Sequence, residues 1–126
     1  MKLLIAGSRS ITDFDLSPYI PRDTDTVISG GASGVDSLAE KYADLHKLSK
    51  YILRPRYEFY KRSAPLKRND EMVEMADAAL IIWDGSSRGS EYMLKQAKKL
   101  GKPITLVKRE EGGDFVIALR EGSWDI

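Results

Sequence analysis

The chain has no cysteine among its 126 residues, which excludes disulfide bonds, thiolate catalysis and zinc–thiolate sites. That absence is compatible with a cytoplasmic protein, and we expect a cytoplasmic location. The net charge is only +1, so a polyanion can be bound only by a local patch and not by the molecule as a whole. The apolar run at residues 3–6 is too short for a signal peptide or a membrane span, and we expect no membrane partner.

Several familiar signatures are also missing. The sequence has neither a G-x-x-x-x-G-K-[ST] P-loop nor a G-x-G-x-x-G dinucleotide fingerprint. His46 is the single histidine, and it falls late in a predicted helix at an exposed position. A Ser-His-Asp device and a histidine metal site are therefore not expected. We expect no metal and no cofactor, and the residues alone assign no catalytic group.

The composition, 42% hydrophobic and 31% charged, is typical of a soluble globular protein, and we expect residues 1–126 to form a single domain. Short, nearly continuous apolar runs predict strands buried on both faces of a parallel sheet. These strands are expected at residues 3–6, 26–29, 51–53, 79–83 and 104–107. Helices are expected between them, at residues 36–48, 69–76 and 90–100, with a short helix that Ser17 caps before Pro18. Residues 115–119 fit either a closing helix or an extra strand.

Alternating strands and helices predict an α/β fold, a Rossmann-like open parallel sheet of about five strands with helices on both faces. The expected strand order is 3-2-1-4-5. In that order the chain reverses direction between the first and fourth strands, and open α/β sheets bind ligands in the crevice there, beyond the carboxyl ends of the strands. Three loops of small residues converge at this crevice: residues 7–10, 30–36 and 84–90.

The loop Gly30-Gly31-Ala32-Ser33-Gly34-Val35-Asp36 follows a strand and opens a helix. Backbone N–H groups and the positive end of the helix dipole make such a turn an anion site, most often for phosphate. Glycine lets the phosphate approach the backbone. The alternative is a tight turn without a ligand. Asp36 suits the helix dipole, accepts hydrogen bonds from a ribose, or orients a neighbouring loop.

The other two loops offer further groups. Arg9 either grips a phosphate or carboxylate through two hydrogen bonds or forms a surface ion pair, for instance with Asp13. Ser90 is either a helix N-cap or a ligand contact. Asp84 ends its strand beside the same crevice.

A basic segment precedes Arg68 and Asn69, which are expected to open the third helix. Its cations are Arg54, Arg56, Lys61, Arg62 and Lys67, and they are interleaved with Tyr57, Phe59 and Tyr60, opposed only by Glu58. Cations mixed with aromatic rings bind single-stranded nucleic acid. The alternative is a solvated loop whose rings rest on the sheet.

Taken together, these motifs resemble the SLOG superfamily, and within it the small YspA-like proteins related to the YpsA group. The resemblance rests on Ile5-Ala6-Gly7-Ser8-Arg9, Val27-Ile28-Ser29-Gly30-Gly31-Ala32-x-Gly34-Val35-Asp36, Arg68-Asn69-x-x-Met72, Ala76-Asp77, Trp83-Asp84-Gly85-x-Ser87-x-Gly89-Ser90 and Gly101-Lys102-Pro103. It implies a Rossmann-like domain that binds a nucleotide or a nucleotide-derived small molecule, as a sensor or a sequestering module. It also implies pairing into a homodimer, which the aromatic residues Tyr57, Phe59, Tyr60 and Tyr92 favour too.

The superfamily also contains the Lonely Guy phosphoribohydrolases and the DNA-binding DprA proteins. The enzymes carry a catalytic glutamate in P-G-G-x-G-T-x-x-E, and the matching position here is Met93, although Arg68 matches the enzymes' arginine. We therefore expect binding without turnover, with a nucleotide hydrolase or a single-stranded nucleic-acid binder as alternatives. The ligand-binding residues expected are Gly7, Ser8, Arg9, Gly30, Gly31, Ala32, Gly34, Asp36, Arg68, Asn69, Asp84, Gly85, Ser87, Gly89 and Ser90.

Overall fold

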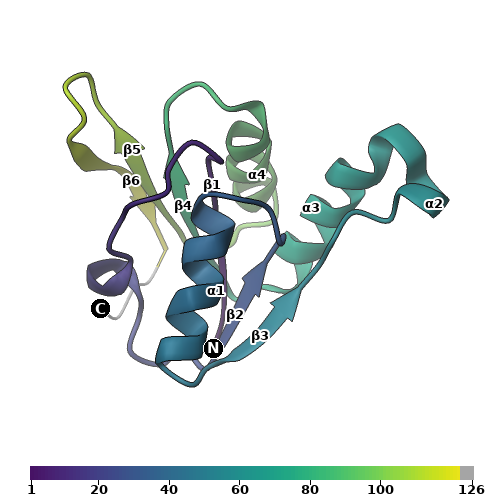
Figure 1. Ribbon diagram of the computed structural model, residues 1–126, viewed down its shortest axis with the longest axis horizontal. Coiled ribbons are helices and arrows are strands. Elements are labelled where there is room, and N and C mark those ends of the chain that lie inside the picture. Colours follow the sequence, from purple (N-terminus) through teal and green to yellow (C-terminus); the bar gives the residue numbers. More distant parts are fainter. Residues whose placement is uncertain (123–126) are drawn as a thin grey trace.

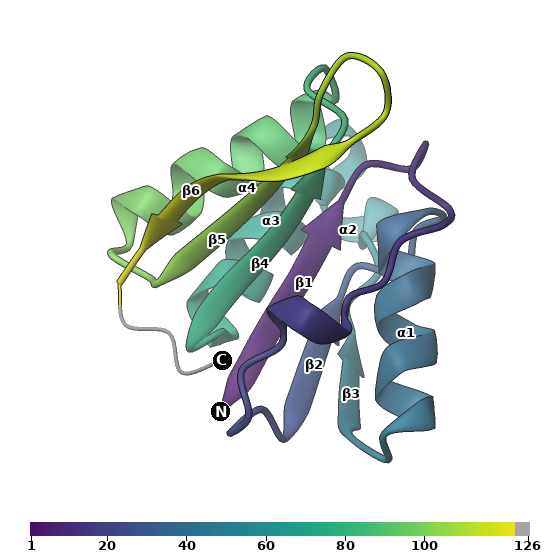
Figure 2. The ribbon, with the colours of Figure 1, turned by 90° about the vertical axis from the view of Figure 1, so that its left-hand side faces the viewer.

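The computed structural model describes residues 1–122, which form one sheet covered by helices on both faces (Figure 1, Figure 2). The strands are β1 (Lys2–Gly7), β2 (Thr26–Ser29), β3 (Ser49–Ile52), β4 (Ala78–Trp83), β5 (Ile104–Arg109) and β6 (Phe115–Glu121). The helices are η1 (Ser17–Tyr19), α1 (Val35–Leu45), α2 (Tyr57–Tyr60), η2 (Lys61–Ser63), α3 (Ala64–Met75) and α4 (Arg88–Lys99). Residues 123–126 of the predicted domain lie outside the described residues.

The sheet has the order β3-β2-β1-β4-β5-β6. The first five strands run parallel, and β6 joins β5 in the antiparallel sense. The predicted α/β class, the order 3-2-1-4-5 and the change of direction between β1 and β4 are confirmed. Of the two predictions for the tail, the extra strand is the one observed.

Alternate residues of the central strands build two separate cores. Leu3 and Ile5 of β1 pack with residues of α1, whereas Leu4 and Ala6 pack with residues of α3 and α4. Figure 2 shows α1 on the near side of the sheet and α3 and α4 behind it. Because both faces of β1 and β4 are buried, only their ends reach solvent, and these ends carry the loops of the crevice.

The strand β3 differs from its prediction in position and burial. It begins at Ser49, two residues earlier than expected, and Tyr51 is 47% exposed. The strand lies at the edge of the sheet, so the expectation of burial on both faces is wrong here.

The helices also begin and end at other residues than expected. α3 starts at Ala64, because Pro65 suits a first turn, so Arg68 lies inside the helix and does not open it. α4 starts at Arg88, with Ser87 as its N-cap, so the prediction of Ser90 as the N-cap is wrong.

Two smaller boundaries change as well. α1 ends at Leu45, three residues early, because Lys47 adopts a positive φ of 57° that no helix continues. Leu16, and not Ser17, is the N-cap of η1.

The basic segment is not a simple loop. α2, η2 and the first turn of α3 stand out from the body of the molecule beside the edge formed by β3 (Figure 1). Within residues 1–122, no helix has the length and apolar character of a membrane span, and no three His, Asp or Glu side chains lie close enough to hold a metal ion.

Candidate functional site

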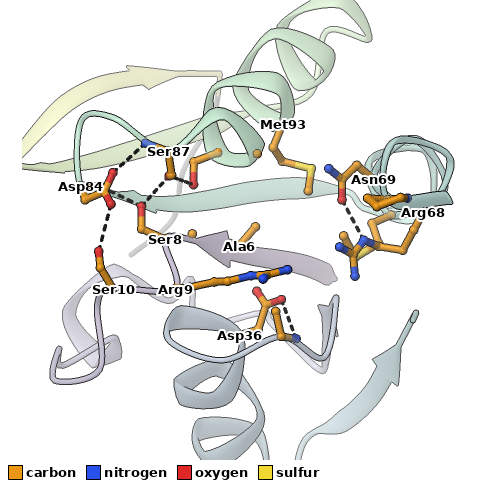
Figure 3. Close-up of a pocket in the computed structure, with 16 residues that line it drawn as sticks. Ala6, Ser8, Arg9, Ser10, Asp36, Arg68, Asn69, Asp84, Ser87 and Met93 are labelled. Carbon is orange, nitrogen blue, oxygen red and sulfur yellow. Dashed lines mark hydrogen bonds between the residues drawn. The ribbon is translucent and has the colours of Figure 1, made fainter. Parts of the chain in front are cut away.

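A cavity of about 470 Å³ opens at the carboxyl ends of β1 and β4, where the strand order predicts a ligand (Figure 3). Most of the predicted site residues line it: Gly7, Ser8, Arg9, Ala32, Asp36, Arg68, Asn69, Asp84, Ser87, Gly89 and Ser90. The cavity is also lined by Ala6, Ser10, Pro65, Met72 and Met93, which were not among the predicted site residues. Four predicted glycines do not line it: Gly30, Gly31, Gly34 and Gly85.

Serine hydroxyls join the loops after β1 and β4. Ser8 is buried; its Oγ accepts the backbone N–H of Asp84 at 2.9 Å and lies 2.8 Å from Ser87 Oγ. Ser87 Oγ in turn donates to Ser90 Oγ at 3.1 Å. These bonds hold one wall of the cavity in place before any ligand arrives (Figure 3).

The Asp84 carboxylate folds its own loop. Oδ1 accepts the backbone N–H groups of Ser86 and Ser87, both at 2.9 Å, and Oδ2 accepts the Ser10 hydroxyl at 2.9 Å. Partial burial acts to raise the pKa of Asp84, but these hydrogen bonds outweigh it and hold the pKa well below its usual range. Asp84 is therefore an ionised turn residue and a poor proton donor.

The first turn of α4 faces the cavity with bare backbone N–H groups. Arg88, Gly89 and Ser90 have no intrahelical acceptor, and none is found elsewhere in residues 1–122. The Ser87 side chain, which makes other bonds, does not cap them. A Cβ built on Gly89 would have no atom within 4 Å, so the space beside this turn is open. The turn combines free donors with the positive end of the helix dipole.

Asp36 brings a carboxylate to the opposite wall. It is 7% exposed, and its Oδ2 accepts the backbone N–H of Ala32 at 3.1 Å. Burial raises the pKa of Asp36 above its usual value, although the Ala32 N–H and the guanidinium of Arg68 act in the other direction. Asp36 thus orients the loop after β2, which is one of the roles expected for it.

Arg68 fastens two loops to α3. Its Nη1 donates to the carbonyl oxygens of Gly30 at 2.7 Å and Leu53 at 3.3 Å, and its Nε donates to Asn69 Oδ1 at 2.8 Å. Partial burial lowers the pKa of this guanidinium, and Asp36 opposes that shift. Arg68 therefore both lines the cavity and holds the ends of β2 and β3 together.

The Arg9 side chain, unlike that of Arg68, does not hold loops together. Its guanidinium reaches across the cavity toward Asp36 (Figure 3), and within residues 1–122 it has no hydrogen-bond or ion-pair partner. The alternative of an ion pair with Asp13 is wrong. Arg9 is the exposed cation that is available to a ligand.

The glycines after β2 serve backbone packing. Gly34 has φ +74°, and a Cβ there would lie 2.5 Å from the carbonyl oxygens of Ser8 and Arg9. Gly31 also has φ +74°, and its Cβ would meet the Arg54 guanidinium at 2.7 Å. The positive φ favours glycine at both positions, and at Gly34 the backbone of Ser8 and Arg9 also leaves no room for a side chain.

The apolar part of the cavity was missed. Ala6, Met72 and Met93 form it, and all three also belong to the core between the sheet and the helices α3 and α4. Ala6 lies next to the last residue of β1, whereas Met72 and Met93 lie inside their helices, so only the packing of α3 and α4 brings them to the cavity. Nothing in the sequence singled out Pro65.

No family model matches the sequence. The chain is similar to the Gene 61 protein of Mycobacterium phage D29, with 31% identity over 84 residues. The match covers 62% of this chain and 67% of the phage protein. The chain belongs to the same family as the Gene 61 protein of Mycobacterium phage D29.

Proposed function

We propose that the cavity binds a nucleotide or a nucleotide-derived small molecule, as a sensor or a sequestering module. The observation that carries this proposal is the bare first turn of α4. Three backbone N–H groups lack acceptors within residues 1–122, and Gly89 leaves open space beside them. A phosphate group satisfies such donors and gains from the helix dipole.

The charges around the cavity favour a phosphate at this end. Arg9 has no hydrogen-bond or ion-pair partner within residues 1–122, so its guanidinium, which points toward Asp36 (Figure 3), can turn toward the phosphate. The Asp36 carboxylate on the opposite wall would repel a phosphate placed there. The ligand's phosphate therefore belongs at α4 and its uncharged part near Asp36.

The remainder of the cavity suits a sugar and a base. Asp36 accepts hydrogen bonds, the Asn69 amide lines the same cavity, and Ala6, Met72 and Met93 offer an apolar surface. The volume, about 470 Å³, is in the range of small-molecule sites. The resemblance to the YspA-like SLOG proteins supports the same ligand class, and pairing into a homodimer stays a prediction.

A nucleotide hydrolase is the second candidate, and Asp36 is the observation that favours it. A buried carboxyl with a raised pKa, lining the cavity, is suited to protonate a leaving base. Against it, the position of the superfamily's catalytic glutamate holds the thioether of Met93. We therefore place binding first.

The direct test is to identify the ligand. Purified protein is heat-denatured, and the released small molecules are identified by mass spectrometry. We expect a phosphate-bearing compound with a nucleobase or a fragment of a nucleotide. Titration calorimetry with adenosine and guanosine monophosphates then measures affinity. The proposal fails if no phosphate compound is released and neither nucleotide binds at millimolar concentration.

A further inference from the structure

A second surface lies outside the cavity, on the segment that projects from the sheet. We call residues 54–67 the arm; it contains α2, η2 and the start of α3 (Figure 1). We propose that the arm binds single-stranded nucleic acid, through its cations to the phosphates and through its rings to the bases.

The charge of the arm is one-sided. Its five cations are all exposed: Arg54, Arg56, Lys61, Arg62 and Lys67. Glu58 is the single acidic residue among residues 54–67. Within residues 1–122 Arg56 is the one cation of the arm that forms an ion pair, with Glu71 at 3.6 Å, and a pair that is this accessible to solvent contributes little.

The same segment exposes three aromatic side chains. Tyr57 is 57% exposed, Phe59 72% and Tyr60 38%. Within residues 1–122 none of the three stacks on another aromatic side chain. Phe59 buries little surface in this fold, and exposed rings between cations are the arrangement on which successive bases stack.

The charge and shape of the arm favour nucleic acid over the other possible partners, a second copy of the chain or a membrane. A two-fold dimer through the arm would place one cationic surface against another copy of itself, which is repulsive. A membrane surface is poorly matched as well, because α2 has four residues and offers no long amphipathic face. A flexible polyanion with stackable bases satisfies both the cations and the rings.

The test uses fluorescence anisotropy with the full chain and labelled oligothymidylate and oligouridylate of about 15 nucleotides. The two probes distinguish DNA from RNA. The triple variant Lys61→Gln/Arg62→Gln/Lys67→Gln removes three cations that have no partner among residues 1–122. The matched control is Lys41→Gln/Lys98→Gln/Lys99→Gln, which removes three exposed lysines of α1 and α4.

We expect the parent and the control to bind, with the slope of log K against log salt about 2 units shallower in the triple variant, at ~0.7 per phosphate contact. Phe59→Leu should weaken binding about fivefold or more, and Phe59→Trp should restore it. Nucleotide binding in the cavity and the thermal midpoint should stay unchanged in all these variants. That readout separates this proposal from the proposed function of the cavity.

Four results would overturn the proposal. The triple variant binds as well as the control; a duplex of equal length binds as tightly as the single strand; anionic phosphatidylserine vesicles retain the protein through the same residues; or the arm variants convert a dimer to a monomer. The second result would remove the role of the rings, and the last two would assign the arm to a membrane or to a second copy.

Discussion

Gly89 offers the sharpest test of the anion site. It lies in the first turn of α4, and a Cβ built there meets nothing within 4 Å. Unlike Gly31 and Gly34 it has no positive φ, so a side chain can be added without backbone strain. The substitution Gly89→Val fills the space that the proposed phosphate occupies. Gly31→Val is a poor alternative, because its strained backbone and the neighbouring Arg54 would disturb the fold.

The size of the effect follows from the donors that are blocked. A hydrogen bond to a charged group contributes about 1.5–3 kcal/mol. Losing one such bond from the first turn lowers affinity about ten- to a hundredfold, and losing more lowers it further. Gly89→Ala should show a smaller loss, while it stabilises the helix by up to about 1 kcal/mol.

The assay is calorimetry with adenosine monophosphate and, as a control, adenosine, together with the thermal midpoint of each variant. We expect weaker monophosphate binding, unchanged nucleoside binding and a midpoint that does not fall. If Gly89→Val binds the monophosphate as tightly as the parent, the phosphate does not sit at α4 and the reasoning is refuted.

Four other predictions concern the rest of the molecule. Arg68→Gln should weaken nucleotide binding at least about tenfold. It should also lower the thermal midpoint, because it removes the hydrogen bonds to Gly30 and Leu53. Arg62→Gln should change neither quantity, and equal losses of affinity in the two variants would indicate diffuse electrostatics. Because the pKa of Asp36 is raised in the folded state, its protonated form stabilises the fold, and this contribution is lost as pH rises from the ordinary carboxyl range through the folded pKa. The midpoint of Asp36→Asn relative to the parent should therefore rise with pH, and a pH-independent difference would contradict this. The parent should release little or no base from nucleoside monophosphates, and Met93→Glu should gain activity; brisk turnover by the parent would overturn the binding function. Light scattering should show a dimer, paired through the exposed edge of β6, and Ile117→Lys should give a monomer; a monomeric parent rejects the dimer.

The framework of the sheet could be predicted because it depends on local patterns. Short apolar runs and the turn residues between them determine strand order through simple rules of handedness. The exposure of β3 could not be predicted. Residues 51–53 are as apolar as those of a buried strand, and Tyr51 is exposed because β3 lies at the edge of the sheet. The arm was also missed as a helical element, because its cations and rings carry no apolar period.

The cavity residues could be predicted better than their roles. Arg68 was expected as a ligand contact, yet two backbone carbonyls occupy its Nη1. Those carbonyls belong to Gly30 and Leu53, which reach Arg68 only through the tertiary arrangement of β2, β3 and α3. The role of Asp84 also differs from the prediction. It was expected as a ligand contact, but its carboxylate accepts the backbone N–H groups of Ser86 and Ser87 in its own turn.

The serine hydroxyls of the crevice form a continuous row. Ser8 Oγ accepts from the backbone N–H of Asp84 and lies 2.8 Å from Ser87 Oγ, and Ser87 Oγ donates to Ser90 Oγ at 3.1 Å. The row therefore runs from the backbone after β4 to a hydroxyl that lines the cavity. A ligand that forms a hydrogen bond with Ser90 engages the whole row, and through it the loops after β1 and β4.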